Sequence, residues 1–145
     1  MIAGGCRCGA VRYTLALDAP PPVYCCHCRD CQRWSGSAFV EQAVIRADAI
    51  AVSGPTIESD VVMPSGSVSH QVACARCFSR IVSTNAARPG MALLRAGTLD
   101  GSDRVEPRAH IWACRRQPWI TLPPAVPAWP ENAPPAALMA ALAGA

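Results

Sequence analysis

Apolar and polar residues alternate along much of this chain in short segments that glycine and proline separate. Over residues 9–15, for example, Val11, Tyr13 and Leu15 fall on one face of an extended chain. Further strands are predicted at 38–46, 49–53, 57–63, 67–73, 79–84, 92–97 and 109–113. Short strands with turn residues between them indicate a mainly β fold made of antiparallel sheet.

Helical signals are confined to two short places. Residues 32–34 follow Cys31 and are predicted as one helical turn, which Gly36 ends. After Trp119 the chain becomes rich in proline and then in alanine and leucine, which predicts an extended tail and a short C-terminal helix. We expect one domain over residues 1–120 and a tail, residues 121–145, packed on the same domain.

The charge of the chain excludes few partners but favours one kind of ligand. All thirteen basic residues are arginine, and the net charge is only +3. Arginine suits carboxylates and phosphates, yet so small a charge does not predict nucleic-acid binding. No segment approaches the roughly twenty apolar residues of a membrane span, and no signal-peptide pattern precedes the first cysteines. We expect a soluble, cytoplasmic monomer or homodimer that does not bind membranes.

Most of the nine cysteines fall in three short clusters: Cys6 and Cys8; Cys26, Cys28 and Cys31; Cys74 and Cys77. Cysteines one to three positions apart can converge on one tetrahedral zinc ion with bonds of about 2.3 Å, whereas disulfides usually join distant residues. The first and third clusters together supply four sulfurs, which predicts a closed structural site. The middle cluster supplies three, the number typical of a zinc with one open position.

Other uses of these cysteines remain open at this point. A secreted disulfide scaffold would carry a signal peptide and an even number of cysteines. An iron–sulfur protein would show a ferredoxin spacing, which this chain does not match. The strongest alternative is a second structural zinc, whose fourth ligand would come from His27, Cys25, His70 or Cys114.

An open three-cysteine site favours the chemistry of thiols. An external thiol bound there would be held as its nucleophilic thiolate at neutral pH. Three thiolate ligands weaken the Lewis acidity that hydrolysis by a zinc-bound water needs, so thiol activation fits better. His27 lies between two of the ligands and is a candidate general base, although its side chain can point away from them.

The segments around the cysteines resemble the glutathione-dependent formaldehyde-activating enzyme family, which also includes centromere protein V. The resemblance rests on residues 5–13, 26–37 and 74–77, with His110-Ile111-Trp112 and Trp119 similar to the closing segment of the family. It implies a β-tent fold related to methionine-R-sulfoxide reductases. It also implies a structural zinc on Cys6, Cys8, Cys74 and Cys77 and a second zinc, where glutathione binds, on Cys26, Cys28 and Cys31. One departure is Phe78, where the family usually has glycine.

We therefore expect a zinc-dependent carbon–sulfur lyase, similar to S-(hydroxymethyl)glutathione synthase, that adds glutathione to formaldehyde or a similar small electrophile. The Cys26, Cys28 and Cys31 site would carry the chemistry. The nearest candidates to bind the carboxylates of glutathione are Arg29, Arg33, Ser35, Gly36 and Ser37. The alternative is a non-catalytic module with two structural zincs that recognises a thiol, a peptide or a macromolecule. A redox role would need a metal-free thiol, and only Cys25 and Cys114 are left over.

Overall fold

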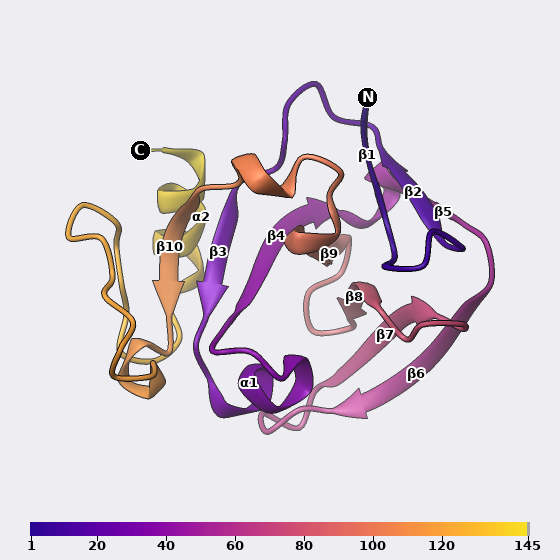
Figure 1. The fold of residues 1–145 in the computed structure, drawn as a ribbon. Helices are drawn as coiled ribbons and strands as arrows, with labels where there is room; N and C mark the ends of the chain where they lie inside the picture. The colour runs from indigo at the N-terminus through magenta and orange to yellow at the C-terminus, as the bar shows by residue number, and fades with distance from the viewer. Residues whose placement is uncertain (145) are drawn as a thin grey trace. The chain divides into compact units, whose positions relative to one another are not determined.

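The computed structural model describes residues 1–144, which form two compact units. Unit 1 comprises residues 1–21 and 43–104, and unit 2 comprises residues 22–42 and the chain from Val105 onward. Figure 1 labels the elements of both. Strand β4 (Val40–Arg46) runs across the boundary between the two units.

Unit 1 begins with a three-stranded antiparallel sheet of β1 (Ile2–Gly5), β2 (Arg12–Leu15) and β5 (Ile50–Ser53), in the order β1-β2-β5. Tyr13 is buried, and its hydroxyl lies 2.9 Å from the hydroxyl of Thr98. Gly4 pairs with Tyr13 across the strands, and a Cβ at Gly4 would collide with that tyrosine hydroxyl. The tyrosine therefore fits only because its neighbour has no side chain.

The rest of unit 1 is an antiparallel meander. Its strands are β6 (Thr56–Val62), β7 (Val68–Cys74), β8 (Arg80–Asn85) and β9 (Met91–Arg95), in the order β9-β8-β7-β6. Three short 3-10 turns occur in this unit: η1 (Ala47–Ala49), η2 (Ala96–Thr98) and η3 (Ser102–Arg104).

One face of the meander in unit 1 is buried but polar. Gln71 donates a hydrogen bond of 2.6 Å to the Ser69 hydroxyl and accepts one of 2.6 Å from Arg80. Asn85 donates to the Ser67 hydroxyl at 2.9 Å. These bonds satisfy polar groups that would otherwise be costly to bury, and they add directional contacts to the apolar core of the unit.

Unit 2 is built on a parallel pair of strands, β3 (Val23–Cys26) and β10 (Pro107–Ile111). All four residues of β3 are buried, as is typical of a strand with both faces covered. The unit also holds α1 (Arg29–Ser35), the 3-10 turn η4 (Ala113–Arg115) and α2 (Pro135–Ala143).

The proline-rich tail runs alongside β10 in unit 2. The backbone N–H of His110 donates to the Pro127 carbonyl, and the N–H of Trp129 donates to the His110 carbonyl, both at 2.9 Å. Arg108 donates at 2.8 Å to the carbonyl of Leu142, whose side chain is buried. These contacts hold the short α2 in place, because nine residues are too few for a stable isolated helix.

The expectation of a mainly β fold with a short C-terminal helix is confirmed. Two strands, β1 and β3, were not among the predicted ones, because a Gly-rich start and a cysteine pair lack clear alternation. Helix α1 begins at Arg29, earlier than predicted, and β10 pairs in parallel rather than antiparallel with β3. The division at residue 120 stays a prediction. None of the described helices has the length and apolar character of a membrane span.

We predict that His70 titrates above its usual range. It pairs directly with Asp60 across β6 and β7; its Nδ1 lies 2.8 Å from that carboxylate and its Nε2 3.1 Å from Glu58. Two acceptors require both ring nitrogens to donate. The hydrogen bond to Asp60 therefore raises the pKa of His70 above 6.5. Proton NMR titration should show this, and Asp60→Asn should lower the value.

The same shift has a defined sign in stability. A raised folded-state pKa means that the His70 contribution is complete below the unfolded pKa and is lost as pH rises through the folded value. Asp48→Asn, which removes an Arg46 partner in the same unit, should leave the His70 titration unchanged. A measured His70 pKa at or below 6.5 would contradict the assignment.

Candidate metal centres

The sulfurs of Cys6, Cys8, Cys74 and Cys77 converge in unit 1, all within 4.8 Å of one another. The Sγ atoms of Cys6 and Cys8 are 3.5 Å apart, and those of Cys8 and Cys74 are 3.8 Å apart. A tetrahedral zinc with bonds of about 2.3 Å requires sulfur separations of about 3.8 Å. The spacing and the soft thiolate donors therefore fit zinc.

Backbone N–H groups surround this four-sulfur group. Val11 donates to Cys6 Sγ at 3.2 Å, and Arg76 donates to Cys74 Sγ at 3.4 Å. The Ser79 hydroxyl lies 3.2 Å from Cys77 Sγ, and this contact lowers the pKa of Cys77 to about 5. These donors favour the thiolate form, which is the form that binds a metal.

Phe78 takes a backbone conformation that glycine would adopt without strain. Its φ is 60°, in the left-handed region, and its N–H donates to the Cys74 carbonyl at 2.9 Å to close the turn. The phenyl ring is 69% exposed, so it gains little from burial. The turn next to Cys77 thus keeps the geometry of a glycine turn despite the bulky residue.

A second group of three sulfurs, from Cys26, Cys28 and Cys31, forms in unit 2, again within 4.8 Å of one another. Cys26 ends β3, Cys28 is the N-cap of α1, and Cys31 lies in its first turn. The N–H of Cys31 donates to Cys28 Sγ at 3.4 Å. The end of β3 and the start of α1 are therefore joined by only two residues, 27–28, and this tight connection brings the three sulfurs together.

Within the described part of unit 2, no fourth His, Cys, Asp or Glu ligand belongs to this group. Cys25 is buried, and that burial raises the pKa of its thiol to about 12. Cys114 is exposed on η4 and is also outside the group. Of the proposed fourth ligands in this unit, neither these cysteines nor His27 joins the three sulfurs. Residue His70 belongs to unit 1 and pairs there with carboxylates.

The three sulfurs strongly couple one another's protonation. Hydrogen bonds from Cys26 and Cys31 lower the pKa of Cys28, while the same contacts with Cys28 and Cys31 raise that of Cys26. Adjacent thiolates repel, so a metal-free cluster keeps part of its protons. A bound divalent cation would displace those protons.

A chain of buried side chains supports Cys31 from β4. The Tyr24 hydroxyl donates to Gln42 Oε1 at 2.8 Å, and Gln42 Nε2 donates to Cys31 Sγ at 3.6 Å. Gln42 is only 6% exposed, so its amide has few orientations available. The pair holds one sulfur of the three-sulfur group in a set direction, as outer-shell residues do in metal sites.

The His27 side chain turns away from the three-sulfur group that flanks it. It is fully buried, its Nε2 lies 3.0 Å from His110 Nδ1, and its ring is 5.3 Å from that of Phe39. Burial lowers the pKa of His27 to about 4 and also lowers that of His110. Both rings are therefore neutral, and His27 packs as an interior residue instead of joining the ligands.

A cavity of about 630 Å³ opens beside α1 in unit 2. Three of the five predicted carboxylate-binding residues line it: Arg33, Gly36 and Ser37. The other two, Arg29 and Ser35, do not. Ser35 instead completes the helix end, since its hydroxyl donates to the Cys31 carbonyl at 2.8 Å and accepts from the Ser37 N–H at 3.1 Å.

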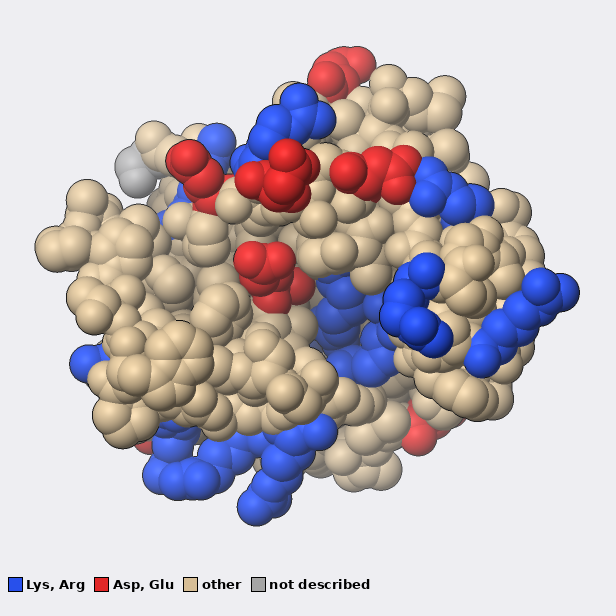
Figure 2. Space-filling model, viewed as in Figure 1, with Lys and Arg blue, Asp and Glu red and all other residues tan. Residues whose placement is uncertain are grey.

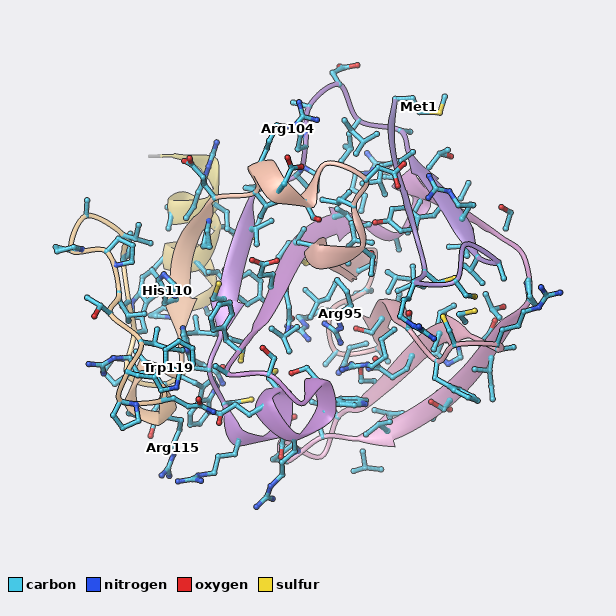
Figure 3. The ribbon with its side chains drawn as sticks, viewed as in Figure 1. Met1, Arg95, Arg104, His110, Arg115 and Trp119 are labelled. Carbon is cyan, nitrogen blue, oxygen red and sulfur yellow. The ribbon has the colours of Figure 1, made fainter. Side chains whose placement is uncertain are left out.

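The cavity is also lined by residues that were not predicted from the sequence: Gln32, Phe39, Gln117 and Trp119. Figure 3 shows Trp119 beside the end of β10, with Arg115 nearby. A large aromatic residue in a proline-rich segment is a signal for a cavity-lining role. The sequence pattern alone, however, does not distinguish an exposed tryptophan from one packed in the core. Only the folded turn at residues 117–120 brings Trp119 to a cavity lined by α1.

Comparison with known proteins places these features in a family. A family model described as glutathione-dependent formaldehyde-activating enzyme matches residues 1–115. A crystal structure of a Rhodobacter sphaeroides protein is similar with a TM-score of 0.54, over 73% of this chain and 92% of that chain. Its sequence identity of 20% means that the likeness shows the fold alone. No curated protein matches the chain.

We predict that Phe78→Gly stabilises the zinc-loaded protein by about 1 kcal/mol, because glycine adopts a positive φ without the steric cost of a Cβ. Urea unfolding would measure the gain. Phe78→Ala is the matched control: it removes the exposed ring but keeps the Cβ, so it should give no gain. Equal effects of the two substitutions would show that the ring, not the backbone, matters.

The two cysteine groups should differ when single ligands are removed. Cys77→Ser breaks the four-sulfur group and should leave little folded protein, because metal binding there contributes on the order of 10 kcal/mol to folding. Cys28→Ser should leave a folded protein with about one zinc fewer. Metal analysis and circular dichroism of both variants test this. Equal unfolding of the two variants would contradict the division into structural and open sites.

Proposed function

The chain belongs to the glutathione-dependent formaldehyde-activating enzyme family, and on this premise we propose that it is a zinc-dependent carbon–sulfur lyase acting on glutathione adducts of formaldehyde or a similar small electrophile. The observation that carries the proposal is the three-sulfur group of unit 2, which has no fourth protein ligand among the described residues of that unit. A three-ligand set leaves room for a substrate atom, whereas the four-sulfur group of unit 1 is closed.

The residues present fit a zinc ion at both groups, since soft thiolates at these separations suit it. When bound by Cys26, Cys28 and Cys31, zinc would hold an external thiol as thiolate near neutral pH. Gln42 and the Cys31 N–H would keep two of the three sulfurs in place. His27 would be a poor proton acceptor, because its Nε2 already lies 3.0 Å from His110 Nδ1 and burial lowers its pKa to about 4.

The reaction balances without any oxidant or reductant. In the direction of addition, the sulfur of glutathione forms a bond with the carbonyl carbon of formaldehyde, and the carbonyl oxygen takes up the proton that the thiol released. The product is S-hydroxymethylglutathione. The lyase direction breaks the same carbon–sulfur bond and returns the proton to sulfur.

The cavity beside α1 is the proposed binding site for the part of glutathione that carries its carboxylates. Arg33 lines it as an exposed side chain, and its guanidinium makes no hydrogen bond or ion pair among the described residues. The N–H groups of Gly36 and Ser37 already donate within the turn that ends α1. Arg33 is therefore the proposed partner of a glutathione carboxylate, with the Ser37 hydroxyl as a neutral neighbour.

Basic side chains gather at the lower left of Figure 2, in the region of unit 2 where Figure 3 labels Arg115. Along the chain, Arg29 and Arg33 belong to α1, and Arg115 ends η4. A local excess of positive charge draws an anionic thiol toward the cavity and raises its encounter rate, more strongly at low salt.

We expect the zinc-loaded protein to bind glutathione with release of about one proton near neutral pH, because the bound form is the thiolate. Calorimetry in buffers of different ionisation enthalpy measures the proton. Arg33→Ala should weaken binding by at least tenfold, since a hydrogen bond to a charged group contributes about 1.5–3 kcal/mol. Arg104→Ala, which removes an exposed arginine of unit 1 that is not part of the cavity lining, is the matched control.

Exchange NMR then separates binding from catalysis. Exchange between formaldehyde, glutathione and their adduct should run faster with wild-type protein than without it, and should return to the uncatalysed rate in Cys28→Ser. Binding without faster exchange would favour a non-catalytic thiol-binding module. A flat calorimetric titration would remove glutathione as the ligand altogether.

A further inference from the structure

The cavity beside α1 has an aromatic half that addition of glutathione to formaldehyde does not use. Phe39 and Trp119 line it, and Trp119 is 72% exposed. Large aromatic side chains are usually buried or engaged, so one left open toward a cavity is a feature of binding sites.

Local hydrogen bonds within the turn restrict Trp119. Its indole N–H donates to Gln117 Oε1 at 2.7 Å, and the Ile120 N–H donates to the Gln117 carbonyl at 3.0 Å. Arg116 adds a bond of 3.2 Å to the Ile120 carbonyl. With its only polar atom engaged inside the turn, the indole presents an apolar ring whose ordering cost on binding is reduced.

Phe39 connects this aromatic half to the three-sulfur group. Its ring is 5.3 Å from that of His27, which lies between Cys26 and Cys28 in the chain. Gln32, also on the cavity wall, donates at 2.7 Å to the His27 carbonyl. A group resting on Phe39 is therefore next to the segment that carries the sulfurs.

The charge and size of the cavity define the class of ligand. Arg33 is the one ionisable residue on its described lining, so the complementary ligand carries an anionic group. A volume of about 630 Å³ exceeds what formaldehyde needs and is typical of sites for larger organic molecules. Two aromatic walls add a preference for a flat apolar group.

We propose that Phe39 and Trp119 form a subsite for the organic group of the aldehyde, and that this chain prefers thiol adducts of aromatic aldehydes. The thiol carboxylate pairs with Arg33, and the aromatic group lies against Trp119. The sulfur–carbon bond forms at the aldehyde carbon and the thiol proton passes to the aldehyde oxygen, with no change of oxidation state. The catalytic part rests on the proposed function; the subsite itself does not.

The binding test uses benzoate and acetate, which share the carboxylate and differ in the ring. Calorimetry on the zinc-loaded protein should show benzoate binding at least tenfold more tightly than acetate. Trp119→Ala should remove about tenfold of the benzoate affinity, as expected for loss of an aromatic contact, and Trp119→Phe should restore most of it. Met139→Ala, which removes an exposed side chain of α2 away from the cavity, should change nothing.

The catalytic test compares benzaldehyde with formaldehyde as partners of glutathione in exchange NMR. Trp119→Ala should lower the ratio of kcat/KM for benzaldehyde to that for formaldehyde by about tenfold. Equal binding of benzoate and acetate, or an unchanged ratio, would overturn the subsite. If benzoate binding depends on Trp119 but neither aldehyde is exchanged, the subsite stands and the proposed lyase activity fails. If formaldehyde is exchanged but benzaldehyde is not, the proposed lyase activity stands and the proposed preference for aromatic aldehydes fails.

Discussion

The constraint on which this molecule depends is the close approach of thiol sulfurs. Two thiolates about 4 Å apart repel by about 4 kcal/mol at an effective dielectric constant of 20. Unit 1 holds a group of four sulfurs and unit 2 a group of three, and within each group the sulfurs lie within 4.8 Å of one another. Each group therefore needs either retained protons or a cation. In unit 1 this requirement ties the turn after β1 to the hairpin between β7 and β8, which are far apart in sequence.

In unit 2 the need for retained protons or a cation has a different structural consequence. There the sulfurs come from one continuous segment, Cys26 to Cys31, so a cation would join few distant parts of the chain. The sulfurs are instead positioned by their surroundings, which are the buried strand β3, the Gln42 amide and the backbone of α1. A site supported this way could leave one coordination position open without weakening the unit, as the proposed function requires.

The cavity of unit 2 depends on a second set of contacts. Trp119 and Gln117 reach it because the chain after β10 closes a hydrogen-bonded turn, while the following tail pairs with β10 through His110. The result places an arginine, two aromatic rings and the helix that carries Cys31 around one space. Local order of this kind lowers the entropic cost of binding a small anion.

What the sequence determined by itself is local. Spacings such as Cys6–Cys8 and Cys74–Cys77 predict sulfurs that converge, because the cysteines within a cluster are neighbours in the chain, and Gly36 ends α1 through its own freedom to adopt a φ of 67°. Alternation of apolar residues predicted most strands for the same reason. Tertiary structure alone decided that β10 lies parallel to β3, that His27 faces His110, and that Trp119 lines a cavity with Arg33. These depend on contacts between residues more than eighty positions apart, which no local pattern records.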